Sequence, residues 1–502
     1  MKLFHQLKNL TVILIILCFA SCETSDNHAF TPPSGPEPTA MYLEVMGERY
    51  EVTFSSLVSS ATTLPLNLRT LSGELGNVDF KVLNYTDFKT ISIHGIPAKD
   101  GVVSIPFKGY IPKDDQLICE YTTASQKGNF AINFYPDNAP KFHCSGEGVI
   151  PGDFYLSFIY QPLIMKVNNA GQLLYYRFEP TDDNGTFQEL GCWDFKKHVF
   201  DGKSYYSYHA PDQKFAEKAK TGYVPGMRIL MDEHYNPVDT IHALRSIDGY
   251  LPDGSPLDGH DFYFFSPTHW IASASYVERE VGDTIRAVAY LQEVDNGEVV
   301  FDWWSTSHPK MLGWGSSSFD TSYDYVHFNS VDVLPDGNWL LSFRALSSII
   351  KVNRNGAGEI LWRVDGEALD PKSSFSGQHY VRYHKNNDEE YITLFDNGNA
   401  HDPSITRAMR LHFKDINQGI VSSGENMLNY TSLKPYFTQA CGAFQDYGDQ
   451  GFVMGWGWST VAGNCTRLVT EYDSNGNEAF RIDRDDEDPM SVDPSYRCVK
   501  CP

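Results

Sequence analysis

Residues 349–364, IIKVNRNGAGEILWRV, contain two β-rich arms around a polar turn with two glycines. Asn- and Gly-containing turns between such arms are typical of β-hairpins. The hairpin belongs to a repeat, because similar polar, usually Gly-containing turns separate β-rich arms at five other places. These are 164–178 (IMKVNNAGQLLYYRF), 227–241 (MRILMDEHYNPVDTI), 289–304 (AYLQEVDNGEVVFDWW), 408–421 (AMRLHFKDINQGIV) and 468–482 (LVTEYDSNGNEAFRI).

A second β-rich unit, made of a strand, a turn and a strand, accompanies each hairpin. Together the two units supply the four strands of a propeller blade, and the pairs follow one another at roughly 40 to 70 residues. The sequence therefore predicts an all-β fold with a six-bladed β-propeller over residues 150–502, and seven blades are the alternative. The second units begin at Gly152, Cys192, His260, His327, His379 and Cys441.

The segment that precedes the repeat is organised differently. From residue 41 to about residue 140, short runs alternate apolar and polar residues, as in 78–82 (VDFKV), and turn residues separate the runs. This pattern predicts a small N-terminal β-sandwich domain over residues 41–140. No cluster of polar residues converges in it, which favours a structural or assembly module.

The N-terminus has the pattern of an export signal. Residues 1–21 combine two lysines with the apolar run 10–20 (LTVILIILCFA), which is too short to span a bilayer comfortably. Small residues before Cys22 resemble a bacterial lipobox, so Cys22 is expected to be the lipidated first residue of a cell-envelope lipoprotein, in the periplasm or at the outer-membrane surface. An ordinary cleaved secretory signal is the alternative. Residues 22–40 are polar and rich in Pro, and are expected to form a flexible tether.

The bulk composition excludes some partners. The 502 residues carry a formal net charge of −24, so the chain is a poor candidate for binding nucleic acid or an anionic membrane surface. An anionic substrate would need a local positive pocket. For the C-terminal Cys498 and Cys501, a disulfide or no special role is expected, and the sequence contains no zinc signature.

Three histidines occupy the same place in three successive repeats. His260, His327 and His379 each stand at the start of a predicted strand. Equivalent positions of successive blades converge near the axis of a propeller, so the three side chains are expected to share one pocket. A single histidine at a strand start commonly satisfies a hydrogen bond, but three together can bind a metal, or can divide nucleophile and acid–base roles.

Arg344 is the fourth candidate site residue. It lies in the strand that returns from the His327 strand through a turn at 335–338 (PDGN), so it is expected at the same end of the blade as His327. A guanidinium beside neutral imidazoles suits a tetrahedral anion better than a metal, because its fork grips two oxygens at once. A surface arginine paired with a carboxylate is the alternative.

These residues resemble the bacterial arylsulfate sulfotransferases, a family with a six-bladed propeller. The resemblance covers about residues 250–460 and rests on the order and spacing of several motifs, since any one of them alone would be weak. The motifs are 324–332 (DYVHFNSVD), 342–344 (SFR), 347–352 (SSIIKV), 360–363 (ILWR), 375–379 (FSGQH), 394–398 (LFDNG) and 455–457 (GWG).

The resemblance implies roles for individual residues. The family's nucleophile falls on His379, its two helper histidines on His260 and His327, and its anion-binding arginine on Arg344. Asn329 falls where the family has a polar pocket residue. The family also implies an N-terminal β-sandwich that helps to dimerise, and sulfuryl transfer without a nucleotide donor; consistently, the chain has no Gly-rich phosphate loop ending in Lys.

The implied reaction needs no cofactor and no metal. Neutral His379 would attack the sulfur of an aryl sulfate, Arg344 would hold the sulfuryl oxygens, and His327 or His260 would protonate the departing phenolate. A phenolic acceptor would then reverse the steps. Relatives often have Asp after the nucleophilic histidine, where this chain has Tyr380. Aromatic candidates for stacking on the aryl group are Tyr325, Trp304, Trp456 and Trp458.

Two other functions fit the same sequence. The three histidines could hold a divalent ion in a metallohydrolase-like propeller, although carboxylates in matched positions are scarce. Alternatively, the chain could be a non-enzymatic surface lipoprotein whose propeller binds a glycan or a partner protein. The sequence does not decide the natural donor and acceptor.

Overall fold

The computed structural model describes two parts of the chain. The first consists of the strands β1–β9 between residues 40 and 133; the second is residues 142–502 without 172, 179–190, 213–214, 216–221, 234, 275–276, 387–388, 430–435, 459–466 and 485–493. The predicted signal segment 1–21, the lipidation site Cys22 and the predicted tether up to residue 39 lie outside the described residues.

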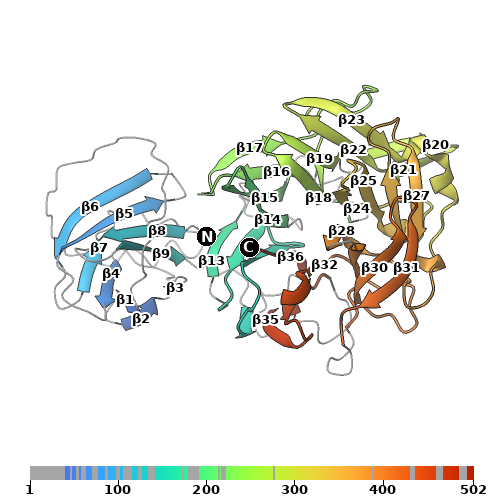
Figure 1. The fold of residues 1–502 in the computed structure, drawn as a ribbon. Helices are drawn as coiled ribbons and strands as arrows, with labels where there is room; N and C mark the ends of the chain where they lie inside the picture. Colours follow the sequence, from blue (N-terminus) through green and yellow to red (C-terminus); the bar gives the residue numbers. More distant parts are fainter. Residues whose placement is uncertain are drawn as a thin grey trace, which may run out of the picture. The chain divides into compact units, whose positions relative to one another are not determined.

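The first part contains two sheets (Figure 1). One has the order β2-β1-β4-β7 and the other β3-β9-β8-β5-β6, and all of their pairings are antiparallel except that of β3 with β9. The strands are β1 (Ala40–Val45), β2 (Glu48–Val52), β3 (Ser56–Leu57), β4 (Leu64–Arg69), β5 (Asn77–Asn84), β6 (Lys89–Pro97), β7 (Val102–Ile105), β8 (Gln116–Thr122) and β9 (Lys127–Asn133).

The second part is almost entirely β-structure in a propeller-like arrangement, which confirms the predicted all-β class (Figure 1). Its first strands are β10 (Phe142–Gly146), β11 (Asp153–Phe158), β12 (Leu163–Val167), β13 (Leu173–Phe178), β14 (Trp193–Phe200), β15 (Lys203–Pro211), β16 (Pro225–Met231), β17 (Pro237–Ile241), β18 (Leu257–Ser266), β19 (His269–Ala274), β20 (Val277–Val281), β21 (Thr284–Val288), β22 (Tyr290–Asp295) and β23 (Glu298–Trp304).

The later elements include five 3-10 turns. They are η4 (Ser305–Ser307), η5 (Pro309–Gly313), β24 (Phe328–Val333), β25 (Trp339–Phe343), η6 (Arg344–Leu346), β26 (Ser348–Val352), β27 (Ile360–Asp365), η7 (Gly366–Ala368), β28 (His379–Asn386), β29 (Glu389–Asp396), β30 (Arg407–Asp415), β31 (Ile420–Asn426), β32 (Ala443–Asp446), η8 (Gly448–Gln450), β33 (Phe452–Gly455), β34 (Arg467–Tyr472), β35 (Glu478–Arg484) and β36 (Ser495–Cys501). Within the described residues, no helix is both long and apolar enough to cross a membrane.

The strands are grouped into antiparallel sheets that follow the chain. Three sheets have four strands: β13-β12-β11-β36, β24-β25-β26-β27 and β28-β29-β30-β31. A five-stranded sheet has the order β10-β35-β34-β33-β32, and an eight-stranded sheet runs β14-β15-β16-β18-β19-β22-β23 with β17 paired to β16; β20 and β21 form a separate hairpin. The 349–364 hairpin of the sequence corresponds to β26 and β27, with Ile350 opposite Arg363.

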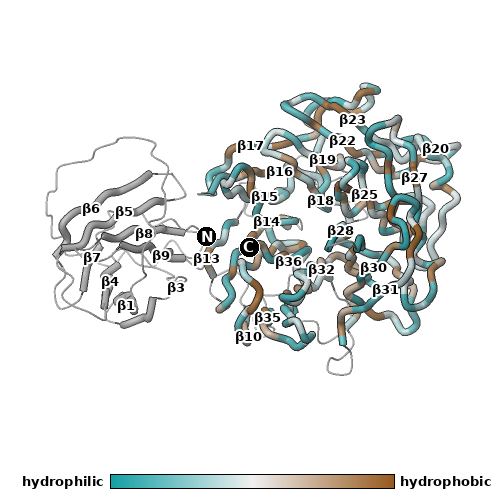
Figure 2. The backbone as a smooth tube through the Cα atoms, in the orientation of Figure 1, coloured by the Kyte–Doolittle hydropathy of each residue, from teal (hydrophilic) through white to brown (hydrophobic). Residues whose placement is uncertain are grey.

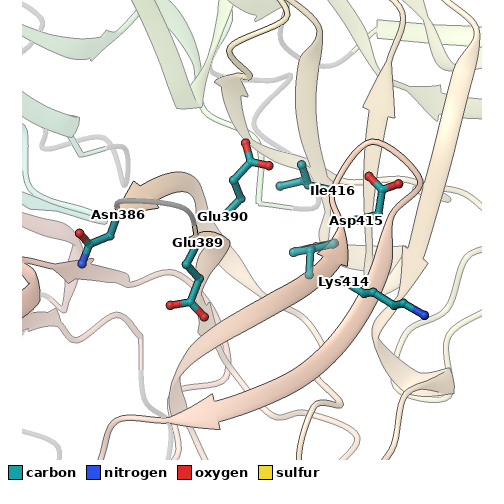
Figure 3. Close-up of a pocket in the computed structure, with 7 residues that line it drawn as sticks. Asn386, Glu389, Glu390, Lys414, Asp415 and Ile416 are labelled. Carbon is teal, nitrogen blue, oxygen red and sulfur yellow. The ribbon is translucent and has the colours of Figure 1, made fainter.

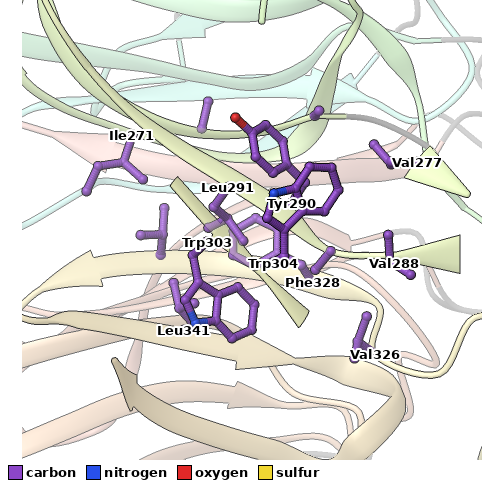
Figure 4. Close-up of a cluster of buried hydrophobic side chains, with 14 of the residues drawn as sticks. Ile271, Val277, Val288, Tyr290, Leu291, Trp303, Trp304, Val326, Phe328 and Leu341 are labelled. Atoms are coloured by element: carbon purple, nitrogen blue, oxygen red, sulfur yellow. The ribbon is translucent and has the colours of Figure 1, made fainter. Parts of the chain in front are cut away.

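Apolar side chains fill the space between neighbouring sheets. A large cluster joins strands β18 to β26 and includes Trp303, Trp304, Phe328 and Leu341, all buried (Figure 4). Every residue of β26 is buried, whereas the outer strand β31 is mostly exposed. Hydrophobic and hydrophilic stretches alternate along the chain in this part of the structure (Figure 2). The burial of apolar area on both faces of the inner strands stabilises the arrangement.

Both ends of the described second part contribute strands to sheets formed mainly by other segments. β36 pairs with β11, and β10 pairs with β35. A buried ion pair between Lys500 and Glu471 joins the two sheets, and Glu471 also accepts hydrogen bonds from the backbone N–H groups of Val149 and Ile150. Cys498 and Cys501 are free thiols, because residues three apart on a strand point to opposite faces.

Candidate active site

Backbone kinks at the starts of the inner strands set the directions of the site side chains. The pairing register shifts at the beginning of β14, β18, β24 and β28, as β-bulges do. Three nearby residues have a positive φ that is uncommon outside glycine: His327 at 47°, Tyr380 at 51° and Cys441 at 65°. Such kinks re-aim a side chain and are common beside active sites. The residue with the positive φ is His327 itself, directly before β24. In β28 it is Tyr380, the residue after His379.

His260 and His327 each bind a carboxylate through Nδ1. His260 Nδ1 lies 2.9 Å from Asp258 Oδ2, and His327 Nδ1 lies 2.5 Å from Asp324 Oδ2. The two imidazole rings meet edge to face, with their centroids 5.0 Å apart and their planes at 87°. Each pair can therefore hold a proton on the imidazole with the carboxylate behind it, as in the His–Asp part of a catalytic triad.

Tyr223 connects these two pairs. Its hydroxyl donates to Asp324 Oδ1 at 3.1 Å, and its ring centroid lies 4.9 Å from that of His327 and 5.6 Å from that of His260. Burial, followed by the charge of Asp324, raises the pKa of Tyr223 well above 10, so the phenol remains protonated and keeps donating to the carboxylate.

His379 has a different set of partners. Its Nδ1 faces two oxygen acceptors, Gly377 O at 3.0 Å and Asn397 Oδ1 at 2.7 Å. Its Nε2 accepts a hydrogen bond from the backbone N–H of Cys441 at 3.2 Å. Nδ1 must therefore donate, and the lone pair of the neutral ring lies on Nε2. Burial holds the pKa of His379 well below 6.5, and the charge of Arg344 lowers it further.

Arg344 is a nearly buried cation without an ion pair among the described residues. Its Nη2 donates to Gln439 O at 3.2 Å, and Phe319 stacks on the guanidinium, with the ring centroid 4.3 Å from Cζ. Its Nε is buried and has no hydrogen-bond partner. Burial lowers the pKa of Arg344, since desolvation disfavours the charged form. Donors left unsatisfied on a desolvated guanidinium are suited to an anion.

Ring contacts, a backbone hydrogen bond and the effects of charge connect the four predicted residues. After burial, the charge of Arg344 is the next cause that lowers the pKa of His379, and His260 also lowers it. Burial lowers the pKa of His327, Asp324 opposes this, and His260 and Arg344 lower it again. The backbone also connects two of them, because Arg344 N donates to His327 O at 2.9 Å. The structure thus brings His260, His327, His379 and Arg344 together as the sequence predicts.

The other predicted site residues lie in different surroundings. Asn329 is fully buried; its Nδ2 donates to Gln378 O at 2.6 Å, next to His379, and its Oδ1 has no partner. Tyr325 lies in the apolar cluster that joins strands β18 to β26, with its hydroxyl bonded to Ser305 Oγ at 2.8 Å. Trp304 and Trp456 are also buried in apolar clusters. Trp458 is half-buried beside a cluster that contains Cys441.

A buried network of ion pairs lies next to the backbone of His260. Arg497 binds Asp194 at 3.0 Å and Asp261 at 3.2 Å, and its neighbour Tyr496 donates to His260 O at 2.6 Å. Burial acts to raise the pKa of Asp261, but Arg382, Lys196 and Arg497 together lower it, so the carboxylate stays ionised. The network fixes the start of β18, and therefore the backbone of His260.

Sequence analysis missed several of these partners. Asp258 and Asp324, two and three residues before their histidines, carry a readable signal, because a carboxylate that close can reach Nδ1. Asn397 lies within the motif at 394–398, but the sequence alone assigns it no role. Tyr223 and Arg497 come from distant segments, and no local pattern marks them.

Two other features of the described residues lie apart from this cluster. A cavity of about 610 Å³ is lined by Asn386, Glu389, Glu390, Phe413, Lys414, Asp415 and Ile416, at the outer turns of the β28–β31 sheet (Figure 3). It shares no residue with the histidine cluster. No group of three His, Cys, Asp or Glu side chains within the described part of the chain has the geometry to hold a metal ion.

Comparison with solved structures gives only weak likenesses. A protein of unknown function from Bacteroides caccae is 11% identical over 70% of this chain and 99% of that chain, with a TM-score of 0.42. A virginiamycin B lyase from Staphylococcus aureus is 8% identical over 84% of this chain and 98% of that chain, with a TM-score of 0.31. Such scores support no argument about this chain. No curated protein matches it.

A family model gives a specific result. The model described as arylsulfotransferase (ASST) matches residues 270–485. This segment contains His327, Arg344 and His379, while His260 lies ten residues before it. The match confirms the resemblance drawn from the sequence motifs: residues 270–485 of this chain are similar to the arylsulfotransferase family.

Proposed function

We propose that this protein moves a sulfuryl group from an aryl sulfate donor to a phenolic acceptor through a covalent intermediate on His379. One observation carries the proposal: a neutral imidazole with its lone pair on Nε2 lies in the field of Arg344, a partly buried arginine that has no ion pair among the described residues. A nucleophile and an anion-binding group in one desolvated cluster are what sulfuryl transfer needs.

The first half-reaction transfers the sulfuryl group to the enzyme. The Nε2 lone pair of His379 attacks sulfur in line, a new N–S bond forms, and the S–O bond to the aryl group breaks with its electron pair leaving on the phenolate. Arg344 donates hydrogen bonds to the sulfuryl oxygens, where charge is concentrated in such transition states. A protonated His260 or His327 gives its Nε2 proton to the phenolate, and Asp258 or Asp324 stabilises that imidazolium.

The second half-reaction reverses these steps. The acceptor phenol gives its proton to the imidazole that lost one, its oxygen attacks sulfur, and the N–S bond breaks to restore neutral His379. The atoms balance without an external cofactor. Half-buried Trp458 and Phe319 are the aromatic rings that we place against the aryl group, because Tyr325, Trp304 and Trp456 lie in apolar clusters.

We also propose the finer architecture expected for this family. Dividing the eight-stranded sheet between β16 and β18, and counting β10 as an added outer strand, gives six blades of four strands over residues 150–502. The two sheets of residues 41–140 would form a sandwich domain that contributes to a homodimer. Export and lipidation at Cys22 would tether the enzyme in the cell envelope, where small aryl sulfates and phenols are its partners.

The test mixes the purified protein with 4-nitrophenyl sulfate and phenol and follows acceptor-dependent release of nitrophenol. His379→Ala should remove transfer by at least about 10⁴-fold, because the nucleophile is lost. His412→Ala is the matched control, since His412 lies on β30 outside the histidine cluster and pairs with Glu389. Transfer that survives in His379→Ala would overturn the proposal.

Three further outcomes point to other functions. Release of nitrophenol without any acceptor would indicate a hydrolase. Activity lost on washing with a chelator and restored by a divalent ion would indicate a metal-dependent enzyme. No turnover of any aryl sulfate would favour a binding protein.

A further inference from the structure

We infer that Asn397 is the positioning residue that selects Nε2 as the nucleophilic nitrogen of His379 and keeps the ring uncharged; this inference rests on the proposed function. Asn397 touches neither of the atoms that would react. It accepts a hydrogen bond from Nδ1 of the imidazole, and it donates one to Cys441, the residue whose backbone N–H contacts Nε2.

The orientation of the Asn397 amide is fixed by its own partners. Its Nδ2 donates to two backbone carbonyls, Thr438 O at 2.8 Å and Cys441 O at 3.1 Å. Both of these atoms accept only, so the amide cannot be turned around without placing oxygen against oxygen. Oδ1 must therefore face His379, and Nδ1 must carry the proton. The side chain is fully buried, so water cannot replace these bonds.

The same amide holds both sides of the imidazole. Oδ1 accepts from Nδ1, while Nδ2 binds the carbonyl of Cys441, whose own N–H points at Nε2. Cys441 adopts a positive φ of 65°, a conformation that a non-glycine residue keeps only when its surroundings hold it. Loss of Asn397 would release the ring and the Cys441 peptide together.

Asp396 in turn holds the turn on which Asn397 lies. It is fully buried at the end of β29, and its Oδ1 accepts from Ser376 N and Gly398 N, both at 2.9 Å. Ser376 precedes Gly377, the second acceptor for Nδ1. One carboxylate therefore fixes the two segments that supply both acceptors, and it does so without touching the imidazole.

A neutral partner has a chemical consequence. A carboxylate at this position would favour the imidazolium and raise the pKa of His379, leaving no lone pair for attack near neutral pH. An amide orients the proton on Nδ1 without adding a negative charge. The ring then stays neutral beside Arg344, whose charge already lowers the pKa of His379.

The experiment compares Asn397→Asp and Asn397→Ala with the wild type, and Asn355→Asp is the control because Asn355 lies on an exposed turn between β26 and β27. The first readout is the imidazole nitrogen NMR spectrum of ¹⁵N-histidine-labelled protein. The His379 signals are identified by their absence in His379→Gln. We expect a proton on Nδ1 and none on Nε2 in the wild type, and a doubly protonated ring at pH 7 in Asn397→Asp.

The second readout is the pH profile of kcat and of KM for 4-nitrophenyl sulfate. Asn397→Asp should lower kcat at pH 7 on the order of 100-fold, with activity recovering as the pH rises through the increased pKa of His379. Asn397→Ala should lower kcat by a similar factor at every pH. KM should change less than about 3-fold in both, because Asn397 does not contact substrate.

The outcomes separate this inference from the proposed function. A wild-type His379 with its proton on Nε2, or an Asn397→Asp enzyme with an unshifted pH profile, would overturn the role of Asn397. The wild-type spectrum decides even if both variants fail to fold, which thermal melting would reveal. If His379→Ala retained transfer while the spectrum showed Nδ1–H, the proposed function would fail and the tautomer assignment would stand.

Discussion

The histidines of the cluster fall into two kinds of surroundings. His260 and His327 rest on carboxylates, those of Asp258 and Asp324, whereas His379 rests on the amide of Asn397 and the carbonyl of Gly377. A carboxylate stabilises an imidazolium; an amide or carbonyl orients the ring without favouring the charge. These surroundings suit the tasks that we propose for the three histidines, proton transfer for the first two and nucleophilic attack for the third.

Removing Arg344 should have the largest effect on this division. Arg344 lowers the pKa of both His327 and His379, and it is the cation that we expect to hold the sulfuryl oxygens. Arg344→Met should lower kcat about 10³-fold, the loss typical of a donor to a developing oxyanion. Arg344→Lys should retain part of the kcat that Arg344→Met loses, because lysine keeps the positive charge but lacks the two parallel N–H donors of the guanidinium. Steady-state kinetics with 4-nitrophenyl sulfate measures both; equal kcat in the wild type and Arg344→Met would contradict the role.

Replacing the carboxylates should make the helper histidines resemble His379. In Asp258→Asn or Asp324→Asn the imidazolium loses its partner, so protonation of the leaving phenolate should weaken. We expect a fall in kcat of about 10- to 100-fold with phenyl sulfate, and a smaller fall with 4-nitrophenyl sulfate, whose phenolate leaves without help.

One of the two variants should show the larger difference between its fall in kcat with phenyl sulfate and its fall with 4-nitrophenyl sulfate. The histidine paired with the replaced carboxylate in that variant is then the acid that protonates the leaving phenolate. A loss that is equal for both donors in both variants would mean that neither pair protonates the leaving group. Measuring kcat for a series of substituted phenyl sulfates gives this comparison directly.

The smallest expected effect concerns His209, a buried histidine outside the cluster. Like His379 it has a neutral partner, Val224 O at 2.7 Å, and burial lowers its pKa from 6.5 to about 4. The unfolded chain binds the proton first, so the stability contributed by neutral His209 is complete above about pH 6.5 and is lost as the pH falls toward 4. The loss is at most about 3 kcal/mol.

Urea unfolding of the wild type and His209→Gln at pH 7 and pH 4.5 measures this effect. The free energy of unfolding should fall more steeply with decreasing pH in the wild type, because glutamine takes up no proton. Identical pH dependence in the two proteins would show that His209 does not remain neutral when folded.

Repetition made much of this molecule predictable. The hairpin turns and the arms around them predict β26–β27 and its equivalents, because turn chemistry and strand composition are local properties. The convergence of His260, His327 and His379 follows from the repeat itself. Arg344 was predicted from one further local feature, the turn that returns its strand toward His327.

The residues that refine the chemistry were less accessible. The surroundings of Tyr325 depend on how neighbouring sheets pack, and it lies in a core cluster although its motif places it two residues from His327. The orientation of the Asn397 amide is fixed only by its hydrogen bonds to Thr438 and Cys441, about forty residues away in the sequence. Such contacts are tertiary, and periodicity within one strand contains no information about them.

The pairing of β36 with β11 has a consequence for how the protein loses activity. Arg497 and Tyr496 on β36 bind Asp194, Asp261 and the backbone of His260, so detachment of that strand would remove one of the cations that neutralise two buried carboxylates and would release the backbone of His260. Detachment of β36 should therefore cost free energy and disturb the histidine cluster at the same time. Heat inactivation and the melting of this junction should occur as one event.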